Sequence, residues 1–176
     1  FIASEDGNVA IVKVLLKAGA NVNQALTATG CSPLWQASQQ GYVDLAKVLI
    51  KAGANVNQAT TDHGCSPLFI ATLNENIDIV KVLIKAGANV NQARTTDGCT
   101  PLWMASQNGY IDLVKVLIKA AGSNVNQART TDGASPLYIA SYQGNVETVK
   151  VLVKAGANVN QADTTNVTSP LWMASQ

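Results

Sequence analysis

TPLWMAS, at residues 100–106, recurs with small changes as SPLWQAS at 32–38, SPLFIAT at 66–72, SPLYIAS at 135–141 and SPLWMAS at 169–175. All five prolines of this 176-residue chain lie in these phrases, at intervals of 34, 34, 35 and 34 residues. A fixed period of this size predicts a solenoid of stacked units, each of which buries its apolar face against its neighbours.

Residues 93–127 show what one unit contains. Thr100 and Pro101 predict a helix start, because a hydroxyl accepts a bond from a first-turn amide and proline suits the first helical position. Gly109 predicts the end of this short helix. The apolar spacing beyond it predicts a second helix that closes at Gly122. The polar residues that follow predict a turn or hairpin, a finger, projecting from the array.

This pattern resembles the ankyrin repeat over essentially the whole chain. The matching segments of that unit are DG at 97–98, TPL at 100–102, Ala105, NG at 108–109, LVKVLIKAAG at 113–122 and NVN at 124–126. The resemblance implies an all-α solenoid of antiparallel helix pairs with projecting β-hairpin or turn fingers. In the family a histidine usually follows TPL and bridges the repeats by hydrogen bonds, whereas this chain has aromatic residues there.

The tetratricopeptide repeat has a similar period but is helical almost throughout. In this chain a polar stretch rich in Gly and Asn separates the helix pairs, and proline opens the first helix instead of following the second. These two features reject the tetratricopeptide interpretation.

The repeat frame makes the whole chain, residues 1–176, a single array. Full units are predicted at 25–58, 59–92, 93–127 and 128–161, with partial units at 1–24 and 162–176. Neither end carries a polar unit of the kind that caps a solenoid. We therefore expect a window from a longer array, or ends that pack against other copies by end-to-end self-association.

Two units depart from the common pattern. Glu75 replaces the glycine found in the other turns between helices, so either Glu75 or Asn76 must take a positive φ, which asparagine tolerates better. The pair Ala120 and Ala121 contains an inserted residue. This insertion predicts a second helix that is one residue longer, with a local bulge.

The composition narrows the partner classes. Twelve Lys and Arg against eleven Asp and Glu give a formal net charge of +1, which argues against a nucleic-acid partner. No apolar run approaches the roughly 18 residues of a membrane span, and the first residues lack the pattern of a signal peptide, so no membrane association is expected. Cys31, Cys65 and Cys99 share one slot in successive units, about 10 Å apart, too far for a disulfide. Free thiols favour an intracellular, cytoplasmic protein.

Positions that hold the same residue in every unit predict the buried packing positions of the array. The leucine of SPL or TPL never changes, which predicts a buried position at Leu34, Leu68, Leu102, Leu137 and Leu171. Six aromatic residues share the next column, Phe1, Trp35, Phe69, Trp103, Tyr138 and Trp172. Rings about 10 Å apart do not stack directly, so we expect packing against neighbouring fingers and helices. Exposed binding anchors are the alternative.

Columns that vary lie in the fingers and at the ends of the first helices, which the resemblance places in a concave groove that grips protein partners. Variation at such positions suggests a recognition surface, although neutral drift of solvated residues gives the same pattern. Leu73 and Tyr142 are the apolar anchors of this hypothesis, and Arg94 and Arg129 are positioned for carboxylates. The candidate partner-binding residues are Thr60, Asp62, His63, Leu73, Asn74, Arg94, Thr96, Asp97, Gln107, Asn108, Arg129, Thr131, Asp132, Tyr142 and Gln143.

The chain has too few of the residues that a catalytic site needs. His63 is the only histidine, Cys65 is the only thiol near it, and no glycine-rich phosphate loop follows a strand. We therefore expect no catalytic residue, no metal site, no cofactor and no enzyme. The sequence predicts a non-catalytic scaffold that binds a protein or peptide of unknown identity. A structural spacer array, engineered or recently duplicated, is the alternative, because KAGANVNQA recurs word for word at 17–25, 51–59, 85–93 and 154–162.

Overall fold

A computed structural model describes residues 7–176, and in this part of the chain it contains ten helices and no strand. The predicted all-α class is confirmed, and the fingers are turns rather than paired strands in the described residues. Phe1, the first member of the aromatic column, lies outside them. Contacts group the chain into two compact halves, an N-terminal half of Phe1–Asn89 and a C-terminal half of Val90–Gln176.

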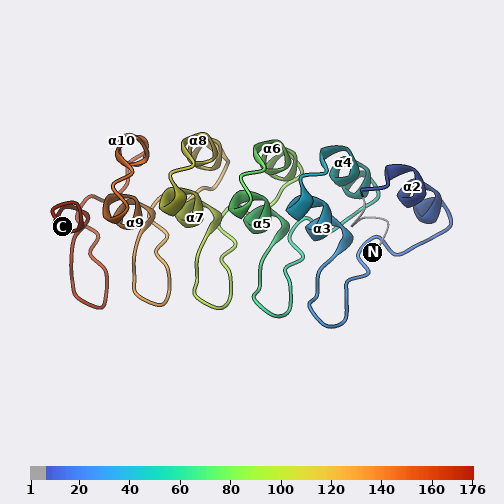
Figure 1. The fold of residues 1–176 in the computed structure, drawn as a ribbon, viewed down its shortest axis with the longest axis horizontal. Helices are drawn as coiled ribbons and strands as arrows, with labels where there is room; N and C mark the ends of the chain where they lie inside the picture. The colour runs from blue at the N-terminus through green and yellow to red at the C-terminus, as the bar shows by residue number, and fades with distance from the viewer. Residues whose placement is uncertain (1–6) are drawn as a thin grey trace. The chain divides into compact units, whose positions relative to one another are not determined.

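Each half is a row of helix pairs (Figure 1). The N-terminal half contains α2 (Val9–Lys17), α3 (Pro33–Gln40), α4 (Val43–Lys51), α5 (Pro67–Leu73) and α6 (Ile77–Lys85). The C-terminal half contains α7 (Pro101–Asn108), α8 (Ile111–Lys119), α9 (Pro136–Tyr142), α10 (Val146–Lys154) and α11 (Pro170–Met173). Within the halves, first helices pack on first helices, as α3 on α5 and α7 on α9, and second helices pack on second helices, as α4 on α6 and α8 on α10.

The first helices begin as the sequence predicts. Thr100 is the N-cap of α7, and its hydroxyl accepts a hydrogen bond from the Trp103 amide at 3.1 Å, with Pro101 at the first helical position. Serines cap α3, α5, α9 and α11 in the same way. Each cap satisfies an amide that has no partner within its helix. A serine or threonine followed by proline therefore starts all five first helices.

The turn at Glu75 differs from the prediction. Glu75 takes the positive φ, at 57°, whereas Asn76 has φ −79° and is the N-cap of α6. The Asn76 side chain is bonded to α3 of the preceding unit, where its amide donates to the Ser38 and Gln39 carbonyls at 3.1 and 3.3 Å. The position in the turn, not the tolerance of asparagine, therefore decides which residue adopts the left-handed conformation.

The insertion at Ala120 and Ala121 does not lengthen the second helix, so that prediction was wrong. Helix α8 has nine residues, as do α4, α6 and α10. Ala120 instead leaves the helix with an extended backbone, φ −68° and ψ 141°, whereas Ala52 at the same position has φ −83° and ψ 4°. The loop that follows α8 therefore holds the extra residue.

The constant NVNQ segment ties neighbouring units together. In the N-terminal half, the Asn23 carboxamide oxygen accepts from the Asn55 amide at 2.7 Å, and the Gln58 side chain donates to the Asn23 carbonyl at 3.2 Å. In the C-terminal half, Asn126 accepts in the same way from Asn158 at 2.7 Å. Equivalent residues thus bond to one another across a repeat, as in-register stacking requires.

The leucine column is buried with one exception. Leu34, Leu68, Leu102 and Leu137 are almost entirely covered, but Leu171 is 79% exposed, so its predicted burial was wrong. Helix α11 packs against α9, and the side of α11 that carries Leu171 faces solvent. A residue type that is constant between units therefore identifies a position in the repeat. Whether that position is buried depends on the elements that pack around it.

Candidate functional site

Within each half the fingers project to the same side, next to the first helices (Figure 1). The four fingers at 26–31, 60–65, 94–99 and 129–134 each close through two backbone hydrogen bonds, and in the last finger the Asp163 amide donates to the Thr168 carbonyl. In one finger, the Arg94 amide donates to the Cys99 carbonyl and the Gly98 amide donates to the Arg94 carbonyl, both at 2.8 Å. In the first variable column of the finger, Thr60 and Asp163 are buried, Arg94 and Arg129 are partly covered, and Leu26 is exposed.

Arg94 is bound to a carboxylate of its own finger. Its guanidinium donates to both oxygens of Asp97, with Nε at 3.0 Å and Nη2 at 2.5 Å, and both side chains are about three-quarters covered. Asp97 also accepts from the Cys99 amide at 3.1 Å and from the Cys99 thiol at 3.0 Å. The bidentate ion pair therefore holds the end of the finger closed.

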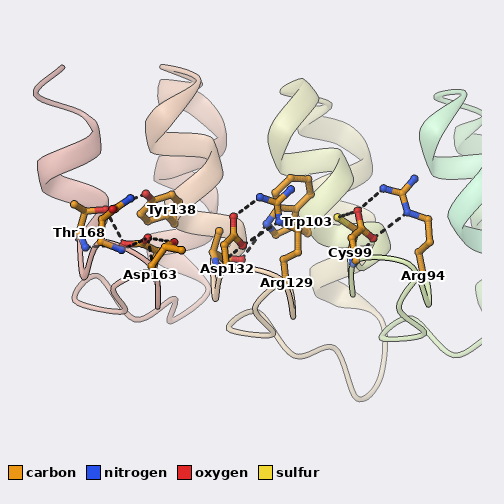
Figure 2. A network of polar contacts seen from close by, with 12 residues as sticks. Arg94, Cys99, Trp103, Arg129, Asp132, Tyr138, Asp163 and Thr168 are labelled. Atoms are coloured by element: carbon orange, nitrogen blue, oxygen red, sulfur yellow. Dashed lines mark hydrogen bonds and ion pairs between the residues drawn. The ribbon is translucent and has the colours of Figure 1, made fainter.

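Arg129 repeats this arrangement in the next finger and adds a contact to α7 of the preceding unit (Figure 2). It donates through both Nε and Nη2 to Asp132, which accepts in turn from the Ala134 amide at 3.1 Å. The Arg129 guanidinium carbon lies 4.5 Å from the centre of the buried Trp103 ring. The Trp103 indole N–H donates to the Ala134 carbonyl at 3.0 Å. Together these contacts join α7 to the finger of the following unit by a cation–π interaction and a hydrogen bond.

Asp163 closes the last finger without an arginine. Its carboxylate accepts from the hydroxyls of Thr165 and Thr168, both at 2.7 Å, and from the Asn166 and Thr168 amides at 3.0 and 2.6 Å. The Tyr138 hydroxyl of the previous unit lies 3.0 Å from the Thr168 hydroxyl (Figure 2). Because the Thr168 hydroxyl donates to Asp163, it accepts from Tyr138.

The fingers of the N-terminal half close with neutral side chains. The Thr60 hydroxyl accepts from the Cys65 amide at 3.1 Å, and the Thr29 hydroxyl accepts from the Cys31 amide at 3.4 Å. These amides occupy the same slot as those of Cys99, Ala134 and Thr168. The backbone amide at this slot therefore has a side-chain acceptor in every finger. The acceptor is a threonine in two fingers, an aspartate paired with an arginine in two others, and an aspartate without an arginine in the last.

The ionisable groups of the finger closures have shifted pKa values. The Arg94 hydrogen bonds hold the pKa of Asp97 far below its usual range, and those of Arg129 lower the pKa of Asp132. Hydrogen bonds led by the Thr165 hydroxyl hold the pKa of Asp163 far below its usual range. Burial raises the pKa of the Cys99 thiol to about 12, with the Asp97 carboxylate as a second cause. Such a thiol is protonated at neutral pH and is a poor nucleophile.

The aromatic column is mainly a packing column in the described residues. Phe69 and Trp103 are fully buried, whereas Trp35 and Tyr138 are partly covered and Trp172 is half exposed. Trp103 and Tyr138 also supply polar bridges to the following finger. The indole N–H of Trp35 is buried and has no hydrogen-bond partner.

The predicted partner-binding residues fall into two groups. Asp62, His63, Thr96 and Thr131 lie exposed in the fingers, whereas Thr60 is buried and Arg94, Asp97, Arg129 and Asp132 are held by the finger closures. Leu73, Asn74, Gln107, Asn108, Tyr142 and Gln143 lie at the C-terminal ends of the first helices. The length of α7, about 12 Å, separates these two groups within a unit.

The first-helix ends carry the more accessible apolar side chains. Tyr142 is 56% exposed and Leu73 is 37% exposed, and polar Gln39 and Gln107 occupy the same slot in other units. Asn74 and Asn108 are anchored, since their amides donate to the Gln39 carbonyl at 2.9 Å and to the Met104 carbonyl at 3.1 Å. Variation between Leu, Tyr and Gln at one exposed slot leaves the frame unchanged and alters only the surface.

Sequence reasoning did not identify the closures, although a signal was present. Arginine followed three residues later by aspartate recurs in two successive fingers, as Arg94 with Asp97 and Arg129 with Asp132. The contribution of Asp163, Thr168, Trp103 and Cys99 follows only from how the fingers fold around them.

A sequence model of the family described as Ankyrin repeats (3 copies) matches residues 1–94 and again residues 91–163. The chain belongs to the ankyrin repeat family. Ankyrin repeats are generally protein–protein interaction modules and are typically non-catalytic. No curated protein gives a significant match to this ankyrin repeat chain.

Two further findings concern the described part of this ankyrin array. No group of three or more His, Cys, Asp or Glu side chains in residues 7–176 is arranged to hold a metal ion. None of the helices there is both long and apolar enough to cross a membrane. Its three cysteines, Cys31, Cys65 and Cys99, are not joined in disulfides.

Proposed function

We propose that this protein is a non-catalytic interaction scaffold that holds a protein or peptide partner on the face formed by fingers and first helices. Membership of the ankyrin family is the observation that carries the proposal. Three cysteines that are not joined in disulfides support an intracellular location.

The first-helix ends supply the anchors in this proposal. Tyr142 and Leu73 are exposed apolar side chains on rigid helices, so a partner would desolvate them at little cost in side-chain order. Arg94 and Arg129 are less suited to a partner carboxylate, since each already binds an aspartate of its own finger. The exposed finger residues Thr96 and Thr131 would supply hydrogen bonds at the rim.

The test compares capture by variants that differ in one face. The intact chain and a Leu73→Ala, Tyr142→Ala variant are used to capture proteins from a lysate, with quantitative mass spectrometry of the bound fraction. A matched control carries Lys51→Ala and Lys119→Ala, two exposed positions at the ends of second helices. Proteins lost from the Leu73 and Tyr142 variant but kept by the control support the proposal. Identical recovery by all three chains favours the structural spacer, for which the repeated KAGANVNQA segment speaks.

A further inference from the structure

The lysines of the N-terminal half gather on its second helices. In the described residues of this half, 7–89, all six lysines lie in α2, α4 and α6, and there is no arginine. The same three helices contain only two acids, Asp44 and Asp78. The other acids of 7–89 are Asp62, in a finger, and Glu75, in the turn between α5 and α6. The second helices of this half therefore carry a net positive charge.

These lysines differ in whether an acid is already bound to them. Lys47 and Lys81 are paired with an aspartate of their own helix, at 3.2 Å from Asp44 and 3.5 Å from Asp78. The last residue of every second helix is a lysine as well, and none of the ion pairs in the described part of the chain includes it. In the N-terminal half these unpaired terminal residues, the lysine row, are Lys17, Lys51 and Lys85.

The lysine row crosses the C-terminal ends of α2, α4 and α6. Helix α2 packs on α4 and α4 packs on α6 (Figure 1), so helices stacked in register place the three ammonium groups about 10 Å apart. All three lysines are exposed. An alanine and a glycine follow each of them, and a Cβ added at Gly19, Gly53 or Gly87 would meet no atom within 4 Å. The surface beside the row is therefore open to an approaching chain.

The helix dipole accounts for part of this arrangement. A cation at the C-terminal end of a helix is favourable, because that end carries a partial charge of about −0.5. This partial charge is smaller than the charge of one ammonium group, and no carboxylate of the described residues adds to it at the lysine row. Each lysine of the row therefore stays net positive and can bind an acid of another molecule.

We propose that the lysine row binds an acidic segment of a partner protein in the polyproline II conformation, with Asp or Glu at every third residue. A polyproline II helix has three residues per turn and rises about 3.1 Å per residue, so acids at this interval lie on one side, about 9 Å apart. That interval matches the lysine row. A β-strand does not fit, because side chains three residues apart point to opposite faces. Duplex nucleic acid carries one charge per about 1.7 Å of its axis, which is much denser than the row.

The test measures fluorescence anisotropy of two labelled peptides with the intact chain at low salt. The first peptide repeats Glu-Pro-Pro five times, and the second has the same composition with its glutamates in one block. The wild-type chain should bind the repeating peptide several-fold more tightly, and its binding should weaken as salt is added. Equal affinity for the two peptides would overturn the proposal.

A pair of variants with the same net charge separates the row from general charge attraction. Lys51→Gln with Lys85→Gln should bind the repeating peptide roughly tenfold more weakly, because two exposed ion pairs are lost. Thr27→Glu with Ala28→Glu makes the net charge equally more negative at two exposed finger positions, and should keep the wild-type affinity within about twofold. Equal losses in both variants would contradict a binding site at the row.

Two further arms exclude other sites and other polyanions. The Leu73→Ala, Tyr142→Ala variant should bind the repeating peptide as the wild type does, since the lysine row lies outside the partner face of the proposed function. Lost binding in that variant would move the peptide to the partner face and overturn the proposal. Tighter binding of duplex DNA or of phosphatidylserine vesicles than of the repeating peptide would assign the row to a different class of partner, with the same consequence.

Discussion

The fingers of the two halves follow one backbone path and close by different chemistry. In the N-terminal half, hydroxyls of Thr29 and Thr60 accept the closing amides. In the C-terminal half, carboxylates do so, two of them held by arginines. Residues that vary between units therefore need not bind a partner. Different side chains can accept the same closing hydrogen bond of a finger.

The halves also differ in how a finger meets the unit before it. Trp103 is buried under Arg129 and donates to Ala134, whereas the indole N–H of the equivalent Trp35 has no partner. A buried donor without a partner costs about 1–3 kcal/mol relative to one that is bonded. We therefore expect the fingers of the C-terminal half to resist local opening more strongly.

Replacing the two tryptophans should give the largest contrast between the halves. Trp103→Ala should lower the free energy of unfolding by about 3–5 kcal/mol, because it removes a fully buried ring and leaves Arg129 without its aromatic contact. Trp35→Ala should cost clearly less, because that ring is only partly covered and its N–H is unpaired. Urea unfolding followed by circular dichroism measures both values. Equal losses would mean that the bridge contributes nothing beyond packing.

Acid should loosen the C-terminal fingers before those of the N-terminal half. The folded-state pKa values of Asp97, Asp132 and Asp163 are lowered, so their stabilisation is present above the unfolded value of about 4 and is lost as pH falls below it. The Thr29 and Thr60 hydroxyls that close the N-terminal fingers do not titrate there. Asp62, whose pKa is lowered first by its hydrogen bond with Thr60, lies exposed on its finger and accepts none of the closing amides, so its protonation leaves the closure in place. Amide hydrogen exchange between pH 6 and pH 3, corrected for intrinsic rates, should show protection lost first at Cys99, Ala134 and Thr168. Uniform loss in both halves would contradict this.

Arg129 should have a smaller effect on stability, through its own finger and through Trp103 in α7. Arg129→Met should lower the free energy of unfolding by about 1–2 kcal/mol, because it removes a partly covered ion pair and a cation–π contact while keeping an apolar stem over Trp103. Asp132→Asn is the matched control, since it removes the ion pair and keeps the Arg129 guanidinium over the Trp103 ring. A larger loss for Arg129→Met assigns the excess to the ring contact, and identical losses would show that the ring contact is without effect.

The turns between helices offer the smallest contrast. Glu75→Gly should raise the free energy of unfolding by about 1 kcal/mol, since glycine adopts the positive φ without the steric strain of a Cβ. Gly144→Ala, in the equivalent turn of the C-terminal half, should lower it by a similar amount although the added methyl meets no neighbour within 4 Å. Thermal unfolding of both variants checks the signs, and a neutral Glu75→Gly would indicate that the glutamate side chain offsets its strain.

Much of the fold could be predicted from the sequence because its signals are local. Thr100 with Pro101 marks a helix start and Gly109 marks a helix end, and both positions agree with α7. The predictions that were wrong concern choices that depend on neighbours. Asn76 bonds to carbonyls of α3 in the preceding unit, and the extra alanine lies in the loop that follows α8.

The candidate site was less predictable, for a physical reason. Exposure of Leu73 and Tyr142 follows from their place at helix ends, which periodicity locates. Whether Arg94 and Arg129 are free for a partner depends on where the finger brings Asp97 and Asp132, a matter of backbone path that residue spacing only suggests.

The amino-acid sequence by itself determined the repeat, its period, the start of each first helix and the family, because these depend on short contiguous segments read many times over. Only the tertiary structure decided which side chains are buried and which are already bonded to a neighbour. Burial and pairing belong to neighbours, and so the same leucine is hidden at position 137 and exposed at position 171.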